Sequence, residues 1–248
     1  MGAGSRFRWK SLRRSQFWRS IFRVPLPADD RGRQALVLSD LFLHLHPPRV
    51  SAASIRLRRT FCMGGIAFLL FVVLTVSGAL LMIYYRPTPE WAYADIQEID
   101  FTVPYGRLLR NLHRWSGHAM ILVVIAHMAR VFYAGAYRPP REFNWVIGVL
   151  LLVFTLFLSF TGYLLPWDQL AFWAVTVGTS MANFVPFIGG EVRTILIGGQ
   201  QVGSETLLRF YVLHVAVLPT LIVLTFFIHI WRWRKDAMLD VSRNGGSQ

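Results

Sequence analysis

Two apolar segments that each carry two histidines constrain this chain more than any other feature. Residues 107–134 and 207–233 are both long and apolar enough to cross a bilayer. Their histidines are His113 and His127 in the first segment and His214 and His229 in the second. The spacing is 14 residues in the first segment and 15 in the second. Because an α-helix has about 3.6 residues per turn, both intervals are close to four turns, and the two rings of each segment leave one face.

Two such helices lying side by side would bring the histidines together as two pairs stacked across the membrane. Imidazole is a standard axial ligand of haem iron, and two imidazoles saturate the iron, which suits electron transfer rather than oxygen binding. The pattern therefore predicts two bis-histidine haems, one held by His113 and His214 and the other by His127 and His229. A histidine inside a membrane can instead serve a helix–helix hydrogen bond or a proton path, but two pairs at nearly equal spacing favour haem.

The composition supports a membrane protein and argues against a nucleic-acid-binding one. Of the 248 residues, 54% are hydrophobic, more than is usual in soluble domains. The net charge is +13, and residues 1–60 carry 13 Lys and Arg against three Asp. Since this charge lies beside membrane segments, it indicates membrane topology and contact with anionic lipid.

The hydropathy pattern predicts an all-α membrane protein, a bundle of four transmembrane helices that holds the stacked haems. The expected spans are residues 61–85, 107–134, 143–165 and 207–233. Residues 87–106 are expected to form an acidic loop, and residues 166–206 to contain short surface helices. The expected regions are a basic extension with an amphipathic segment on the membrane surface, the four-helix domain and a polar tail. They cover residues 1–60, 61–235 and 236–248.

The charges of the loops predict the orientation in the membrane. The basic segments are the N-terminal extension, the 134–142 loop and the C-terminal tail, whereas the 87–106 and 166–206 loops are acidic. Since Lys and Arg favour the cytoplasmic face, both termini are expected on the cytoplasmic (N) side. His113 and His214 then lie near the opposite (P) side, and His127 and His229 lie near the N side.

Glycines and arginines complete the expected haem sites. Glycine lets a porphyrin edge approach the backbone closely. The glycines are Gly64 and Gly78 in the first span and Gly148 and Gly162 in the third, and each pair is 14 residues apart. Arginines near the ligands are expected to hold haem propionates by charge-assisted hydrogen bonds. The candidates are Arg114 and Arg209 on the P side and Arg130, Arg138 and Arg141 on the N side.

Several motifs of the chain are similar to those of one family. They are His113-Arg114-Trp115, Pro140-Arg141-Glu142, Gly162-Tyr163-Leu164-Leu165-Pro166-Trp167-Asp168, Leu208-Arg209-Phe210-Tyr211 and the two histidine pairs. Together they resemble the N-terminal, four-helix part of cytochrome b over about residues 61–235. The spacings of 14 and 15 are similar to those of the cytochrome b6 type, including the related bacterial menaquinol–cytochrome c reductases.

The resemblance implies an oxidoreductase subunit of a quinol–cytochrome c (or plastocyanin) reductase, here in a bacterial inner membrane. Electrons from P-side quinol oxidation would pass to a Rieske iron–sulfur protein and through two b haems to an N-side quinone-reduction site, contributing to proton translocation. The implied partners are the Rieske protein, a C-terminal cytochrome b subunit like subunit IV, a c-type cytochrome, quinone and membrane lipids, in a homodimeric complex. This chain would supply part of the quinol site, through Tyr163, Pro166, Trp167 and Asp168.

The single cysteine points to a third haem. Cys62-Met63-Gly64-Gly65 resembles the Cys-x-Gly-Gly at the start of the first helix of b6-type proteins, where one thioether holds an extra c-type haem beside the N-side haem. The other interpretation is a buried structural thiol. Since no Cys-x-x-Cys-His occurs in the chain, ordinary c-haem attachment is excluded.

Two other functions remain open at the level of sequence. A dihaem cytochrome b could be the membrane anchor of another quinone-linked oxidoreductase, such as a dehydrogenase or hydrogenase, and would keep the same histidine pairs. A haem-free transporter or scaffold could use intramembrane histidines in other ways. Bound haem would exclude the haem-free transporter or scaffold. Co-purification with a Rieske protein would distinguish the reductase subunit from the membrane anchor of another oxidoreductase.

Overall fold

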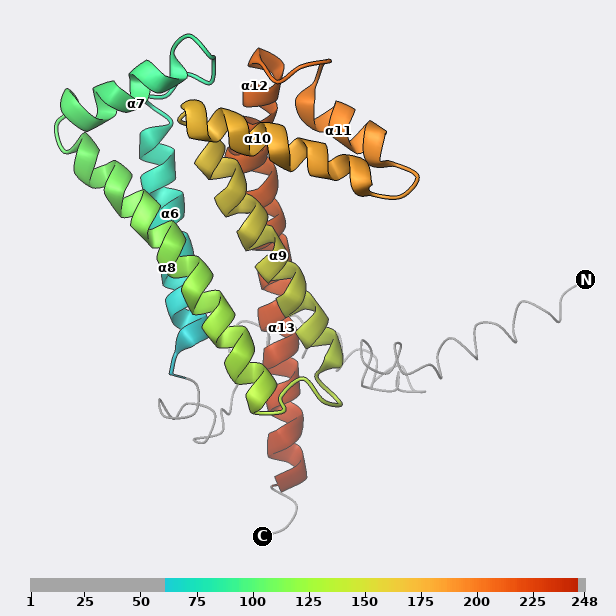
Figure 1. Ribbon diagram of the computed structural model, residues 1–248. Helices are drawn as coiled ribbons and strands as arrows, with labels where there is room; N and C mark the ends of the chain where they lie inside the picture. Colours follow the sequence, from blue (N-terminus) through green and yellow to red (C-terminus); the bar gives the residue numbers. More distant parts are fainter. Residues whose placement is uncertain (1–60, 245–248) are drawn as a thin grey trace, which may run out of the picture. The chain divides into compact units, whose positions relative to one another are not determined.

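The computed structural model describes residues 61–244, and its side chains are described as far as Trp233. The described part is all-helical and contains no strand (Figure 1). Its helices are α6 (Met63–Leu81), α7 (Ala92–Phe101), α8 (Gly106–Tyr133), α9 (Glu142–Leu164), α10 (Gln169–Met181), α11 (Gly189–Ile197), α12 (Ser204–Val212) and α13 (Leu218–Asn244). A 3-10 turn, η1 (Ala182–Phe184), follows α10, and a π-helical turn, η2 (Leu213–Val217), joins α12 to α13. The expected amphipathic segment of residues 1–60 lies outside the described residues.

Four helical runs are long and apolar enough to cross a membrane. They are Met63–Leu81, Gly106–Tyr133, Glu142–Leu164 and Ser204–Trp233. The last run joins α12, η2 and the first part of α13. Many of their large apolar side chains are exposed, as in Leu69, Leu122 and Phe227, which is the surface that lipid would cover. The prediction of an all-α protein with four transmembrane helices and short helices between the third and fourth is confirmed.

The described chain divides into two compact units. The larger contains residues 63–126 and 151–224, and the smaller contains residues 61–62, 127–150 and the chain from 225 onward. The helices α8, α9 and α13 each contribute one part to each unit. His113 and His214 belong to the larger unit, and His127 and His229 belong to the smaller.

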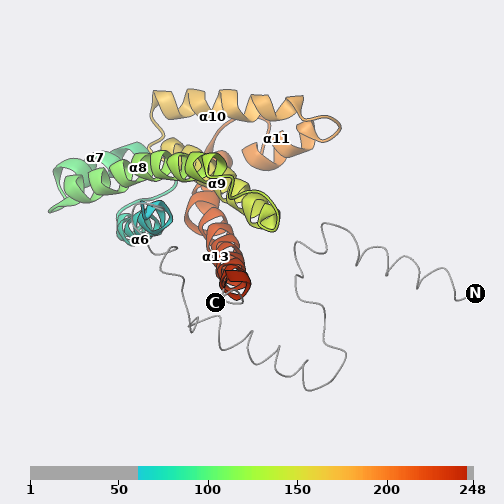
Figure 2. The same cartoon turned by 90° about the horizontal axis from the view of Figure 1, so that it is seen from below.

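The larger unit has its core where α9 ends and α10 begins. Leu164, Val175 and Phe210 are almost fully buried and pack together, with Trp167 beside them. Asp168 starts α10 because its side chain accepts a hydrogen bond from the Ala171 amide at 2.8 Å, the usual role of an N-cap aspartate. Figures 1 and 2 show α10 and α11 beside one another, at an angle to α9.

The stretch expected to be an acidic loop contains a helix instead, α7, and this prediction was wrong. Its acidic residues pair with arginines at the ends of neighbouring helices. Asp95, only 1% exposed, accepts the Arg86 backbone amide at 2.7 Å and its guanidinium at 2.5 Å. Asp100 pairs with Arg110 of α8. Ion pairs with residues outside the segment therefore hold α7 against the ends of α6 and α8 (Figure 1).

Candidate functional site

In the larger unit, the rings of His113 and His214 face each other. Their ring centres are 6.2 Å apart, and the ring planes are inclined at 74°. Bonds of about 2 Å from a metal to each ligating nitrogen, with each ring centre about 1 Å behind its nitrogen, put two axial imidazole centres about 6 Å apart. The separation therefore fits two imidazoles that would hold one haem iron between them.

The surroundings of His113 leave its Nε2 nitrogen available to a metal. Nδ1 of His113 lies 2.9 Å from the Ser77 hydroxyl oxygen. The hydroxyl donates its own proton to the Val73 carbonyl at 2.6 Å, so its oxygen accepts the Nδ1 proton of His113. A neutral imidazole that carries its proton on Nδ1 has the lone pair on Nε2. Gly78 faces the same ring, and a Cβ there would lie 3.1 Å from Cε1 of His113.

His214 is held in a similar way by α9. Its Nδ1 lies 3.0 Å from the Leu158 carbonyl, which accepts its proton, and 3.2 Å from the Thr161 hydroxyl oxygen. Thr161 itself donates to the Leu158 carbonyl at 3.0 Å. Gly162 backs the ring so closely that a Cβ there would lie 2.5 Å from Cε1 of His214. Each histidine of this pair therefore meets a hydroxyl residue followed by a glycine.

The π-helical turn η2 contains His214 and explains why the second histidine pair is 15 rather than 14 residues apart. The Leu218 amide donates to the Leu213 carbonyl five residues earlier, whereas an α-helix uses the fourth. Such a turn accommodates about one extra residue in an otherwise α-helical run, and π-turns are frequent at functional sites. The 15-residue interval thereby covers about as many turns as the 14-residue interval in α8.

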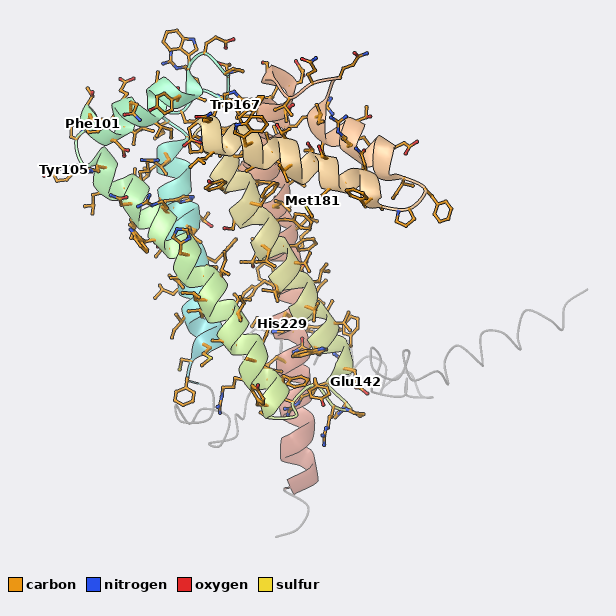
Figure 3. The ribbon with its side chains drawn as sticks, in the orientation of Figure 1. Phe101, Tyr105, Glu142, Trp167, Met181 and His229 are labelled. Carbon is orange, nitrogen blue, oxygen red and sulfur yellow. The ribbon has the colours of Figure 1, made fainter. Side chains whose placement is uncertain are left out.

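The smaller unit contains the second pair, with His229 on α13 (Figure 3). His127 lies in the last part of α8 and belongs to the same unit as His229. A Cβ on Gly148 would lie 3.6 Å from Cε1 of His229, which is an ordinary van der Waals contact. Nδ1 of His229 is buried and has no hydrogen-bond partner in the part of the chain that the structure describes.

Three of the four predicted glycines, Gly78, Gly148 and Gly162, therefore each back a predicted ligand. The fourth, Gly64, lies exposed in the first turn of α6. Next to it, the thiol of Cys62 is exposed, not buried as a structural thiol would be. The backbone of Cys62 is left-handed, with φ at +50°, just before α6 begins.

The five arginines predicted as propionate partners have different surroundings. Arg209 donates to the Ile195 carbonyl and packs against Gly198, which ties α11 to α12. The guanidinium of Arg114 lies 5.7 Å from the ring of Trp115, that of Arg130 lies 4.9 Å from the ring of Phe61, and that of Arg138 lies 5.9 Å from the ring of Tyr137. Arg141 is partly exposed at the start of α9.

The segment predicted to belong to the quinol site forms the turn from α9 to α10. Tyr163 is more than half exposed, whereas Trp167 (Figure 3) packs on the core and has a left-handed backbone with φ at +51°. The phenol of Tyr85 donates to the Leu165 carbonyl at 2.6 Å, and its ring stacks on Tyr211 at 5.7 Å. The turn containing Pro166 is thus held by Tyr85, which follows α6, as well as by the Asp168 cap.

Ser77, Thr161 and Arg232 were missed from sequence. The signal for the first two was present, because Ser77-Gly78 and Thr161-Gly162 repeat a hydroxyl residue before a predicted glycine. Arg232 follows His229 by three residues and is completely buried, with its guanidinium 5.7 Å from the ring of Phe143. It lies near the end of the fourth expected span, and only the structure shows its burial.

Paired histidines on helices that can span a membrane, with glycines behind them, are typical of membrane cytochromes with bis-histidine haems. The comparison with known proteins points to one family. The family Cytochrome b/b6/petB matches residues 50–237, and the chain belongs to this family. Membership places it among the multi-pass, b-haem-binding subunits of quinol-oxidising bc- and b6f-type complexes in energy-transducing membranes.

Similar proteins extend over most of the chain. The cytochrome b6 of Heliomicrobium gestii is 44% identical over 180 residues, 73% of this chain and 84% of that protein. The cytochrome b6 of Heliobacterium mobile is 46% identical with the same coverage, and that of Chlamydomonas reinhardtii is 42% identical over 178 residues, 72% of this chain and 83% of that protein. A solved structure titled "Hyperthermophilic respiratory Complex III" matches with a TM-score of 0.65 and 29% identity, over 71% of this chain and 47% of that chain.

Proposed function

We propose that this chain carries electrons between two quinone sites through two b haems, held by His113 with His214 and by His127 with His229. The observation that carries the proposal is the first pair, with ring centres 6.2 Å apart and both Nδ1 atoms hydrogen-bonded. This arrangement presents an Nε2 lone pair from each ring to a single iron. Each haem, when bound, supplies a one-electron carrier.

The protein's own residues orient the ligands and shape the quinol-oxidation site. Tyr163, Pro166, Trp167 and Asp168 form a turn that the Tyr85 hydrogen bond and the Asp168 cap hold in place. Since this turn presents only one short surface, a Rieske protein and a C-terminal cytochrome b subunit like subunit IV would complete the site. A c-type cytochrome would then accept the electron in a homodimeric quinol–cytochrome c reductase.

Cys62 is proposed to bind a third haem, of c type, through a single thioether. Two observations support this role. The thiol is exposed rather than packed in a core, and it immediately precedes α6, whose first residues continue the Cys-x-Gly-Gly pattern. The thiol would add across a haem vinyl group to form the thioether.

The arginines and the orientation complete the proposal. Arg114 would bind a propionate of the P-side haem, while Arg130, Arg138 and Arg141 would bind the propionates of the N-side haem. Arg209, already bonded to the Ile195 carbonyl, would act on a propionate through its remaining donors. The basic segments support an orientation with both termini on the cytoplasmic side of a bacterial inner membrane.

A pyridine haemochrome spectrum of the purified chain, paired with a haem-stained denaturing gel, tests the proposal. We expect two b haems and one covalent haem signal per chain, and we expect Cys62→Ala to remove only the covalent signal. Two b haems without a covalent signal would remove the third haem. Two b haems with no Rieske protein on purification would support a membrane anchor of another oxidoreductase instead. A chain without any haem would overturn the electron-transfer function.

A further inference from the structure

Two buried hydroxyls, Ser77 and Thr161, lie against the two histidines of the larger unit. They are 2% and 3% exposed, and each lies within 3.2 Å of an imidazole Nδ1. They come from different helices, α6 and α9, so the two contacts arise independently. Neither residue belongs to the iron ligands of the proposed function.

The hydrogen-bond directions are assigned from the shorter bond of each hydroxyl, which runs to a backbone carbonyl. Ser77 has one hydroxyl proton, and the Val73 carbonyl accepts it at 2.6 Å, so the serine oxygen accepts from His113. Thr161 gives its proton to the Leu158 carbonyl at 3.0 Å, which leaves the threonine oxygen and the same carbonyl to share the Nδ1 proton of His214. In both rings the proton is therefore held on Nδ1.

The setting makes these bonds stronger than exposed ones. A groove beside Ser77 is lined, apart from Ser77 itself, by apolar side chains only, among them Val73, Val76 and Leu109. In such surroundings water does not compete, and a hydrogen bond is electrostatically stronger than in water.

The smaller unit differs at the corresponding positions. The residue before Gly148 is Ile147, which has no hydroxyl. Nδ1 of His229 has no hydrogen-bond partner among the described residues. His214 and His229 thus differ in the groups that their Nδ1 atoms meet, although both are backed by a glycine of α9.

We propose that Ser77 and Thr161 are positioning residues that set the tautomer and donor strength of His113 and His214, and so lower the reduction potential of the haem that these two histidines would hold. The inference rests on the proposed haem sites and deepens them. An acceptor on the Nδ1 proton raises the basicity of the ligating nitrogen. A more basic ligand would favour the oxidised iron, so removing either hydroxyl should raise the potential of this haem.

The test is an optical redox titration of the purified holoprotein, carried out on Ser77→Ala, Thr161→Val and the double variant. We expect the midpoint potential of one haem to rise and that of the other to stay unchanged. Groups that orient metal ligands are worth about tenfold or more, and a tenfold change in a one-electron equilibrium corresponds to about 59 mV. Because the shift is confined to one haem of the same molecule, the other haem is the internal reference.

Thr155→Val is the matched control. Thr155 is buried on the same helix as Thr161 and donates to a backbone carbonyl, that of Leu151, at 2.8 Å, and no hydrogen bond joins it to a histidine among the described residues. This variant should leave both potentials unchanged. If Thr155→Val shifts a potential as much as Thr161→Val does, the effect comes from the helix and the proposal is wrong.

Conservative variants cover the case in which a substitution releases haem. Ser77→Thr and Thr161→Ser keep the hydroxyl and should retain both haems with native potentials, whereas loss of haem in these two would show that packing, not the hydroxyl, matters. Unchanged potentials in Ser77→Ala and Thr161→Val with both haems present would overturn the inference and leave the haem sites intact. No haem in the unsubstituted protein would instead overturn the proposed function.

Discussion

The three glycines that back histidine rings give a graded prediction, because the space behind each ring differs. A Cβ would lie 2.5 Å from Cε1 of His214 at Gly162, 3.1 Å from Cε1 of His113 at Gly78, and 3.6 Å from Cε1 of His229 at Gly148. Carbon atoms in contact lie about 3.5–4.0 Å apart. Alanine therefore fits at Gly148, is tight at Gly78 and overlaps the ring by about 1 Å at Gly162.

The free-energy cost of each alanine substitution follows from this overlap. Forcing an extra methyl group into a packed site costs about 1–3 kcal/mol, and at Gly162 the shift falls on the ring that would ligate iron. A displacement of about 1 Å is half of a metal–nitrogen bond of about 2 Å, so it breaks the ligation. We expect Gly162→Ala to lose one of two b haems, Gly78→Ala to lose part of the same haem, and Gly148→Ala to keep both.

The assay is the ratio of b haem to protein in purified chains, with redox difference spectra to identify the haem that is lost. Gly148→Ala is the matched control, because it makes the same substitution behind a histidine with room to spare. Full haem content in Gly162→Ala, or equal losses at Gly148 and Gly162, would refute the steric reasoning.

Two further predictions concern the segments around the histidine pair of the larger unit. Asp95→Asn should lower the free energy of unfolding by about 1–3 kcal/mol, seen as a lower Tm, because it weakens the bonds from the Arg86 amide and guanidinium. Those bonds from Arg86 hold the pKa of Asp95 below its usual range, so its stabilising contribution is present above the carboxyl's unfolded-state pKa and is lost as pH falls through the lowered native pKa. Acidification should therefore narrow the Tm difference between the unsubstituted protein and Asp95→Asn, and a difference independent of pH would contradict the ion pair. Tyr85→Phe removes the hydrogen bond to the Leu165 carbonyl, should cost about 1 kcal/mol, and should raise the KM for quinol in the assembled complex without changing haem content. An unchanged KM would show that the bond does not hold the turn for quinol.

Periodicity was enough to predict the four spans and to single out the histidines, because hydropathy and helical spacing are local properties of the sequence. It failed at α7, whose acidic residues suggested a solvated loop. Their partners include Arg86, which precedes the segment, and Arg110, which follows it. Pairing between segments is a tertiary property, and no local pattern reveals it.

At the candidate site, too, local patterns were visible in the sequence, whereas contacts between segments were not. The 15-residue interval was visible in the sequence, but the π-turn that contains His214 depends on backbone hydrogen bonds. The hydroxyls of Ser77 and Thr161 could have been noticed because each precedes a predicted glycine, yet only the structure shows that they meet the rings. The burial of Arg232 depends on side chains that pack from other segments, among them Phe143.

The central claim is that two pairs of histidines each ligate one haem, and electron paramagnetic resonance of the oxidised, purified chain tests it most directly. We predict two distinct low-spin, bis-imidazole b-haem signals per chain, with His214→Ala removing one and His229→Ala removing the other. A single signal that either variant abolishes, or two signals that survive both substitutions, would contradict the assignment of the pairs.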